Sequence, residues 1–592
     1  MTMNFRFPID IGNGINVNPD TVAFYYDHTE VEKAGGYFPI GTNTVWHGGL
    51  HIHTSNLDTP VFACADGKIV AARLPEEKEK AHGHYGSHSF ILIEHVFHGA
   101  KKGYKNTLVE GHKLRSELVH AHPGYGTSAF PGYGSGMGQY VCTTYCAEVL
   151  RRSGYTDCAS GEELYKIINI YNLPEEPINK RTPAVDNVAN SEHWRSKGVV
   201  YALAMPNPTV QGTEFTDLNT VQPGDFLQYW WKVGTKRKGH GVQVEEHFGD
   251  GLVSIHSSHG NPEGISVSGK LHKLKNEYRS YVVRPKGNKT EIYYSLYMHL
   301  NNGPIEGNKG YLKKLKWLKR WLGDDDTVTV QGSSKMYWVY EGTTKAPKEI
   351  GKFTEGAKLT KTKTVGNWEK VKFRTDDPNI TFTNAWMGEY SFAYVANTDL
   401  KQYNYASKLT DLKEGKVVEP NMPVKAGEQI WGSGEYGSPG YRANLIHWEI
   451  FSENNLFPPD QFPNWKKVED TDENFNMDCH AILDMVEQEW FGFDDKLTFG
   501  EIKDFYTSQN LKVSELRRTA CKFMSEWGIP DLEKAINDLK GVWFTFHLKE
   551  RMQPYLWWSD TKALAQAKSK RKVWHYNPIM VLEQLADYYK DW

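Results

Sequence analysis

The sequence lacks an excess of either charge, a long apolar run and any regular spacing of cysteines. Its 592 residues include 69 basic and 72 acidic side chains, which gives a net charge of −3. A chain so balanced has no overall field that would attract nucleic acid or an anionic membrane. No run reaches the roughly 18 apolar residues that a membrane-spanning helix needs. Neither nucleic-acid binding nor membrane insertion is therefore expected.

The cysteines are too scattered for a disulfide scaffold or a zinc knuckle, because none of them has CxxC spacing. They are Cys64, Cys142, Cys146, Cys158, Cys479 and Cys521. The opening segment MTMNFRFPIDIGNG also lacks the charged and apolar stretches of a secretory signal. We expect synthesis in the cytoplasm, and delivery by a dedicated machine if the substrate lies outside it.

Length and composition predict a folded chain of several domains. At about 150 residues per domain, roughly three to five domains are expected. Hydrophobic residues make up 39% of the chain and aromatic residues 13%, and there are 53 glycines. These values are typical of a strand-rich globular protein rather than of a disordered one. A multidomain α+β architecture is the expected fold class.

Several separate segments carry a strand pattern. Residues 47–74 alternate apolar and polar side chains and place Asp66 and Gly67 in a turn, which predicts a β-hairpin. Similar patterns recur at residues 87–97, 292–300, 426–437 and 445–451.

In their order and in their local residue patterns, these segments resemble LytM-type, lysostaphin-like zinc endopeptidases, whose β domain carries an HxxxD motif, a YxHL strand and an HxH strand. The resemblance implies one β-rich domain that is split by two insertions, which chains tolerate at exposed loop tips. Its pieces would be residues 1–107, 288–325 and 402–464.

The same resemblance implies a zinc site in which some family residues are replaced. His47 matches the first ligand and His447 the last, while His51 stands where the family has aspartate. Three histidines can hold zinc and leave a position open for water. His299 matches the YxHL histidine, but Leu445 replaces the first histidine of HxH. Hydrolysis by the metal-dependent mechanism is therefore expected to be weak or absent. A vestigial site is favoured over a site for a structural or regulatory metal and over a second active site.

Residues 108–287 carry the parts of a cysteine hydrolase. A helix pattern begins at Cys142 and ends at Gly154, and strand-like runs with His240 and His256 follow. A helix N-terminus lowers the pKa of a thiol, and a histidine can take and return its proton. This order resembles NlpC-type, papain-like α+β hydrolases. The resemblance implies Cys142 as nucleophile, His240 as general base and acid, and His256 as the residue that orients the imidazole.

Some residues near this site depart from the family pattern or compete for a role. Val141 stands where the family often has aspartate, but no reacting group is lost. Cys146, one turn after the nucleophile, is expected to be a buried structural residue. His259 competes with His256 for the orienting role. His112 lies in loop-like sequence and is expected to be solvated.

Three further segments complete the chain. Residues 326–401, with short strands and a GNWEKV segment, resemble bacterial SH3-like β-barrels, which bind cell-wall peptide or pack against a catalytic domain. The basic run at 313–321 predicts an amphipathic helix with solvated lysines. Residues 465–592 have helical periodicity and predict a separate helical C-terminal domain. Its CKFMSEWG and VWHYNPIMVLEQL segments resemble peptidoglycan-degrading effectors of type VI secretion systems.

Together the resemblances imply a hydrolase that cleaves an amide bond of the peptidoglycan peptide stem through a thioester at Cys142. No cofactor would be required, although zinc could bind at the degenerate site. An effector of this kind implies a delivery protein, an immunity protein in the producer, and action in the periplasm of a target cell. The alternatives are a phage-type lysin, a zinc-dependent endopeptidase, a non-catalytic wall-binding protein, and acyl transfer or deamidation on a protein target.

Overall fold

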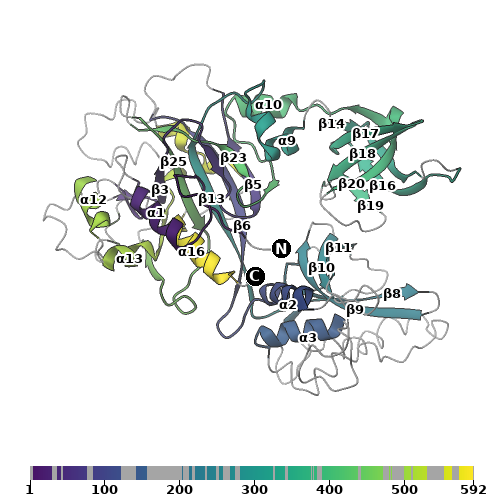
Figure 1. The fold of residues 1–592 in the computed structure, drawn as a ribbon, viewed down its shortest axis with the longest axis horizontal. Coiled ribbons are helices and arrows are strands. Elements are labelled where there is room, and N and C mark those ends of the chain that lie inside the picture. Colours follow the sequence, from purple (N-terminus) through teal and green to yellow (C-terminus); the bar gives the residue numbers. More distant parts are fainter. Residues whose placement is uncertain are drawn as a thin grey trace.

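The described part of the chain is a β-rich α+β protein with several antiparallel sheets and nine α-helices in the computed structural model (Figure 1). The structure describes residues 4–29, 36–41, 45–76, 85–121, 142–155, 203, 212–215, 220–233, 236–247, 252–257, 267–273, 281–323, 327–339, 344–374, 377, 379–382, 390–437, 442–470, 479, 482, 499–508, 511–529, 552–562, 564 and 572–590. None of the helices in these ranges is long and apolar enough to cross a membrane.

The largest sheet gathers strands from the whole length of the chain. In spatial order its path is β22 (Met422–Val424), β5 (Gly67–Arg73), β6 (Ser89–Ala100), β13 (Asn288–Leu300), β25 (Ala443–Ser452), β28 (Lys572–Tyr576), β27 (Thr519–Met524) and β26 (Lys466–Glu469). β3 (Gly49–His53) and β24 (Gly434–Tyr436) also pair with β25. β26 and β27 run parallel, and the other neighbours are antiparallel.

Residues 47–74 form strands, but the expected hairpin is wrong. β3 pairs with β25, and β5 pairs with β6 and β22. β4 (Pro60–Phe62) pairs with β23 (Gln429–Gly432). Another short pair joins β1 (Ile40–Gly41) to β2 (Val45–Trp46). Alternation along a strand specifies which face is buried, whereas the partner is chosen by residues far along the chain.

The two faces of the large sheet belong to different hydrophobic clusters. Along β6, Ile91 and Ile93 join one cluster, whereas Phe90 and Leu92 join the other. This division follows from strand geometry, because successive side chains point to opposite faces. Both faces are covered by other elements, so the middle strands β6, β13 and β25 are largely buried.

The C-terminal residues belong to this sheet, so the expected separate helical domain is wrong for the described residues. β28 pairs with β25, and β27 pairs with β28. Trp557 and Trp558 lie in the cluster on one face. The other cluster includes side chains from α1 (Pro19–Thr29), α12 (Phe499–Thr507), α13 (Leu511–Arg517) and α16 (Pro578–Tyr588). The helical periodicity was therefore real in places, but it ran on into residues that form β27.

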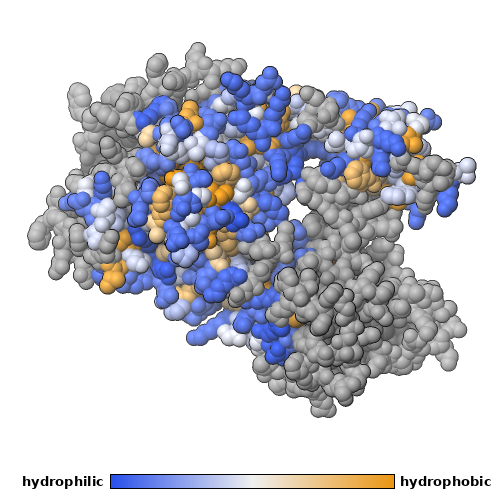
Figure 2. Space-filling view, in the orientation of Figure 1, coloured by the Kyte–Doolittle hydropathy of each residue, from blue (hydrophilic) through white to orange (hydrophobic). Residues whose placement is uncertain are grey.

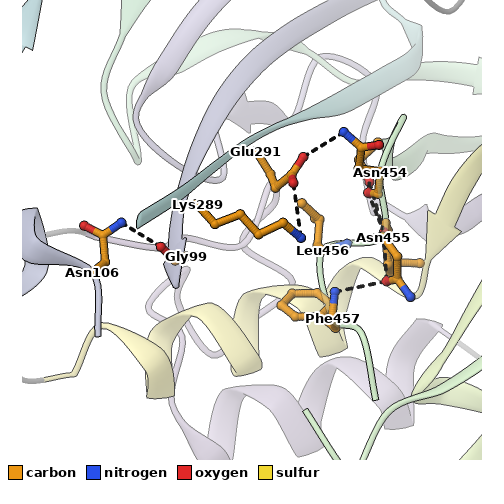
Figure 3. A network of polar contacts seen from close by, with 10 residues as sticks. Gly99, Asn106, Lys289, Glu291, Asn454, Asn455, Leu456 and Phe457 are labelled. Carbon is orange, nitrogen blue, oxygen red and sulfur yellow. Dashed lines mark hydrogen bonds and ion pairs between the residues drawn. The ribbon is translucent and has the colours of Figure 1, made fainter. Parts of the chain in front are cut away.

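The first insert leaves and rejoins the large sheet at adjacent strand ends. Ala100 lies opposite Asn288 in the pairing of β6 with β13. The Asn288 side chain accepts from the Thr107 backbone N–H at 2.9 Å and donates to Thr107 Oγ1 at 2.7 Å. Asn106 Nδ2 donates to the Gly99 carbonyl at 2.7 Å (Figure 3). These bonds fix the root of the insert against the sheet.

The described residues of this insert form helices α2 (Thr107–Ala121) and α3 (Cys142–Arg152) and an antiparallel sheet. In spatial order its strands are β11 (Val267–Lys273), β10 (Leu252–Ser257), β9 (Lys236–His247), β8 (Phe226–Val233), β12 (Tyr281–Pro285) and β7 (Gly212–Phe215). The expected helix and the strands β8 to β10 are confirmed. The expectation for His112 was wrong, because it is buried on α2.

The second insert forms an eight-stranded antiparallel sheet, at the upper right of Figure 1. In spatial order its strands are β19 (Ile380–Phe382), β16 (Lys348–Thr354), β15 (Ser333–Trp338), β20 (Tyr390–Ala396), β18 (Trp368–Arg374), β17 (Leu359–Val365), β14 (Thr327–Val330) and β21 (Leu400–Gln402). Among the described residues the first and last strands in this order do not pair with each other, so the expected closed barrel is not formed there. Its core is apolar and contains Phe353 and Phe373.

The basic run before this insert is an amphipathic helical segment, as its pattern predicted. It forms α8 (Tyr311–Lys314) and α9 (Lys316–Leu322), and α10 (Ala406–Lys413) follows the insert. Trp317 and Trp321 are buried, whereas Lys316 and Lys319 are exposed. On the face drawn in Figure 2, the coloured surface is mainly hydrophilic, with hydrophobic residues in small groups.

A neutral histidine lies inside the large sheet. His95 Nδ1 donates to the Asp66 carbonyl at 2.9 Å, and its Nε2 lies 2.7 Å from Ser295 Oγ. Burial lowers the pKa of His95 to about 4. In the unfolded chain a histidine has its usual pKa of about 6.5. Below that pH the unfolded chain therefore takes up a proton on His95 readily, whereas the folded chain does not.

Lowering the pH from 7 to 5 is expected to destabilise the wild-type chain more than a His95→Gln variant. The depressed pKa means that the free energy of unfolding falls as pH drops from about 6.5 towards 4, by about 2 kcal/mol at pH 5. Urea unfolding of both chains at the two pH values measures the difference, since the other histidines contribute equally to each. Equal losses in the two chains would contradict this prediction.

Candidate metal centre and candidate cysteine site

The candidate metal centre forms where β3 meets β25. His51 lies directly opposite His447 in the register of these strands. His47 precedes β3, and Gly48 and Gly49 lie between His47 and His51 in the chain. A Cβ on Gly49 would overlap the carbonyl oxygen of residue 448 on β25. Glycine is therefore required there, because only the bare backbone can come so close to β25.

The three imidazoles lie close enough to share one ion. One nitrogen from each of His47, His51 and His447 lies within 4.8 Å of the others. His47 Nδ1 donates to the Gly49 carbonyl at 2.9 Å, which leaves its Nε2 as the nitrogen with a lone pair. Burial lowers the pKa of His47, which favours this neutral form. Neutral imidazole is the form that binds metal.

The environment of His447 is the test of whether a metal would fit. Its Nε2 lies 3.4 Å from Glu449 Oε2, while its Nδ1 is buried and makes no hydrogen bond within the described part of the chain. A buried nitrogen without a partner carries a free-energy cost that a ligand can remove. Three histidines whose ring nitrogens lie this close together match a zinc site with an open position. The residues present therefore fit the ion.

Glu449 is held by side chains from the C-terminal segment. Its Oε1 lies 2.7 Å from His575 Nδ1, and Trp527 Nε1 donates to its Oε2 at 2.7 Å. Burial would raise the pKa of Glu449, but hydrogen bonds with His447 and His575 hold it well below the usual range. The carboxylate is thus charged and supported from three sides.

A second carboxylate, Glu526, reaches the centre from the same segment. It begins the 3-10 helix η9 (Glu526–Gly528), and the Gly48 N–H donates to its Oε1 at 3.4 Å. Burial and repulsion from Glu449 raise its pKa to about 7, against the attraction of His47. A carboxyl group with such a pKa can both accept and give a proton near neutral pH.

His299 lies at the edge of the cluster. Its Nδ1 donates to the Ser87 carbonyl at 2.7 Å, and its ring stacks on Tyr436 at 3.9 Å. Its ring centre is 6.2 Å from that of His51. Burial lowers the pKa of His299 to about 3, so the ring is neutral. Leu445, which the sequence resemblance matches to the first histidine of HxH, is fully buried.

The candidate cysteine site is described through its backbone elements. Cys142 is the first residue of α3, and α3 lies against β9 and β10. His240 is on β9 opposite residue 229, and His256 is on β10 opposite residue 243. The side chains of Cys142, His240 and His256 lie outside the described residues, as does the whole of His259. Cys146 is buried, as expected.

Comparison with protein-family models, with curated proteins and with solved structures gives no match.

A second cysteine and histidine pair is structural. Cys64 Sγ lies 4.0 Å from His95 Nε2, and both side chains are buried inside the sheet. Burial raises the pKa of Cys64 to about 11. A thiol that stays protonated and cannot reach solvent does not act as a nucleophile.

The sequence did not indicate three of the residues around the metal centre. Glu526, Trp527 and His575 lie in a segment that the sequence assigned to a separate helical domain. Glu449, the partner of Trp527 and His575, is 78 residues from Trp527 and 126 residues from His575. The only available signal was the unusual presence of charged and histidine side chains within apolar runs.

Proposed function

We propose that this chain hydrolyses amide bonds in the peptide stem of peptidoglycan, with a zinc ion held by His47, His51 and His447. The observation that carries the proposal is the buried Nδ1 of His447, which has no hydrogen-bond partner among the described residues and lies beside two further imidazoles. The adjacency of β6, β13, β25 and β3 supports a lysostaphin-like arrangement of the large sheet. This assignment differs from the vestigial site that the loss of one family histidine favoured.

The surrounding residues supply the proton chemistry of hydrolysis. A zinc ion bound there would polarise the substrate carbonyl and acidify a water molecule. The Nδ1 of His299 bonds to the Ser87 carbonyl, so its Nε2 would be the nitrogen that could accept a hydrogen bond from the attacking water. The Glu526 carboxylate would be the group that takes the proton of the attacking water and gives it to the nitrogen of the leaving amine. Glu526 thus fills the role left by Leu445.

The wall peptide as substrate, and delivery by a type VI machine, come from the resemblances in the sequence. They imply an immunity protein in the producing cell and action in the periplasm of the target cell. The open eight-stranded sheet is then an accessory domain of the SH3-like kind. A phage-type lysin would use the same chemistry, so the centre itself does not separate these two settings.

A second centre is favoured by one specific observation. The helix α3 begins at Cys142 and lies against the strand that carries His240. This arrangement supports a papain-like hydrolase in the first insert, in which Cys142 forms the acyl-enzyme and His256 orients the imidazole. The free N–H groups at the start of α3 would stabilise the thiolate and the oxyanion.

Purified peptidoglycan is expected to be cleaved by the full chain, and chelation with EDTA is expected to remove most of that cleavage. Added zinc should restore it, because the ion supplies the acidified water. Mass spectrometry of the released muropeptides measures the reaction and names the bond through its new amine and carboxylate. Full cleavage after chelation, with complete loss under a thiol blocker, would assign the activity to Cys142 instead. No cleavage under any condition would leave a wall-binding protein.

A further inference from the structure

We propose that Trp527 and His575 are positioning residues of the metal centre, which act through Glu449 to set the orientation and metal affinity of His447. The inference rests on the metal centre proposed above and adds to it a requirement for the C-terminal segment. Without that segment the three histidines would still be present, but Glu449 would not hold His447 in its orientation. Two strands and a short helix that are remote in sequence would then be part of the site.

The contacts that carry this inference are short and fully enclosed. The His575 imidazole and the Trp527 indole each lie 2.7 Å from a different oxygen of Glu449. Glu449, His447 and His575 have no exposed surface, and Trp527 is 7% exposed. Hydrogen bonds from donors to a buried carboxylate are among the stronger ones in proteins. These two hydrogen bonds therefore fix the orientation of the Glu449 carboxylate independently of its contact with His447.

His447 needs this fixed carboxylate because one of its ring nitrogens lies within 4.8 Å of a nitrogen of His47 and of His51. Glu449 Oε2 lies 3.4 Å from His447 Nε2, so the proton of the neutral ring is placed on Nε2 and the lone pair on Nδ1. The same carboxylate oxygen accepts from Trp527, whose ring lies edge-on to His447 with centroids 5.2 Å apart. Carboxylates that hold a ligating histidine in this way fix its tautomer and raise its basicity.

His575 is itself held rigidly. Its ring stacks on Phe523 of β27, with centroids 3.9 Å apart, and Phe523 stacks on Trp46 at 4.6 Å. A Cβ on Gly48 would lie 2.9 Å from His575 Nδ1 and would overlap Glu449. The chain that carries His47 therefore runs directly over the pair of Glu449 and His575. The same buried pair thus lies next to Gly48, the neighbour of His47, and next to the ring of His447.

The alternative is that Glu449 is only a buried charge that needs neutralising. A lone carboxylate in the interior is costly, and donors would be required there in any case. That role predicts a loss of stability when a donor is removed, but no specific change in metal binding. Metal affinity, measured apart from stability and activity, separates the two roles.

The experiment uses the full chain and its Trp527→Phe, His575→Leu and His575→Asn variants. Zinc affinity is measured by chelator competition, and the ligand field by the visible spectrum of the cobalt-loaded chain. Removing a donor with Trp527→Phe or His575→Leu is expected to weaken zinc about 10- to 100-fold, the range seen for such outer partners. His575→Asn, whose amide can place a donor near the position of Nδ1, is expected to recover most of the affinity.

A matched control is Trp558→Phe, because Trp558 is a buried tryptophan in the layer of Trp557 and Trp527. This variant is expected to bind zinc within about twofold of the wild type. Wild-type affinity in Trp527→Phe and His575→Leu would overturn the inference, and so would an equal loss in Trp558→Phe. If the wild-type chain binds neither zinc nor cobalt, the proposed metal centre itself is wrong. The two failures are thus distinguishable.

Discussion

Replacing His447 with alanine is expected to remove stable zinc binding from the full chain and, with it, the metal-dependent cleavage of peptidoglycan. His447 contributes a buried Nδ1 that makes no hydrogen bond within the part of the chain that the structure describes. Loss of a direct ligand should cost more than the 100-fold upper range for outer partners. The variant also leaves Glu449 with one contact fewer. Zinc content after dialysis, and mass spectrometry of digested peptidoglycan, measure both effects.

A control is needed for the general effect of altering a buried histidine. His95→Gln changes an imidazole that lies in the same sheet, on β6, and contacts Asp66 and Ser295 rather than the centre. This variant should retain zinc at neutral pH. Equal zinc content in His447→Ala and wild type would show that the three imidazoles do not form the binding site. Retained zinc with lost cleavage would instead place His447 among the residues that act on substrate.

The strands of the large sheet could be predicted, but their neighbours could not. The alternating patterns at residues 292–300 and 445–451 lie within β13 and β25. The same kind of pattern at residues 47–74 suggested a hairpin, yet β3 pairs with β25 rather than with β5. Periodicity specifies the buried face of a strand. It carries no information about a partner that lies hundreds of residues away.

The C-terminal segment shows how local periodicity can mislead. The sequence around α13 has helical spacing, but residues from Thr519 onward form β27 and pair with β28. Cys521 and Phe523 on this strand are buried in the core of the sheet. Burial against the sheet outweighs the weak intrinsic preference of the segment for helix.

The three histidines of the candidate metal centre were predicted from the sequence, whereas the residues that support them were not. His47, His51 and His447 occupy motif positions, and the structure brings them together. Trp527 and His575 belong to no motif, and their role depends on docking against Glu449. The resemblance suggested a vestigial site because Leu445 stands in place of a histidine, and the sequence did not indicate that the Glu526 carboxylate reaches Gly48, next to His47.

Replacing Cys142 with alanine is expected to abolish any cleavage that a thiol blocker inhibits, while zinc content stays at the wild-type level. Cys142 is the first residue of α3, where free backbone N–H groups and the helix dipole favour a thiolate. The reaction is followed by mass spectrometry of muropeptides from the full chain and from its Cys142→Ala variant. The change removes a nucleophile and little volume, so the melting temperature should hardly change.

Cys146→Ala is the matched control for this second centre, because Cys146 lies one turn further along the same helix and is fully buried. It should keep most of the thiol-dependent cleavage. If the two centres cut different bonds, Cys142→Ala and His447→Ala will each remove their own product and leave the other. If Cys146→Ala were the inactive variant and Cys142→Ala kept its activity, the start of α3 would not hold the nucleophile. The pairing of Cys142 with His240 across α3 and β9 would then have to be abandoned.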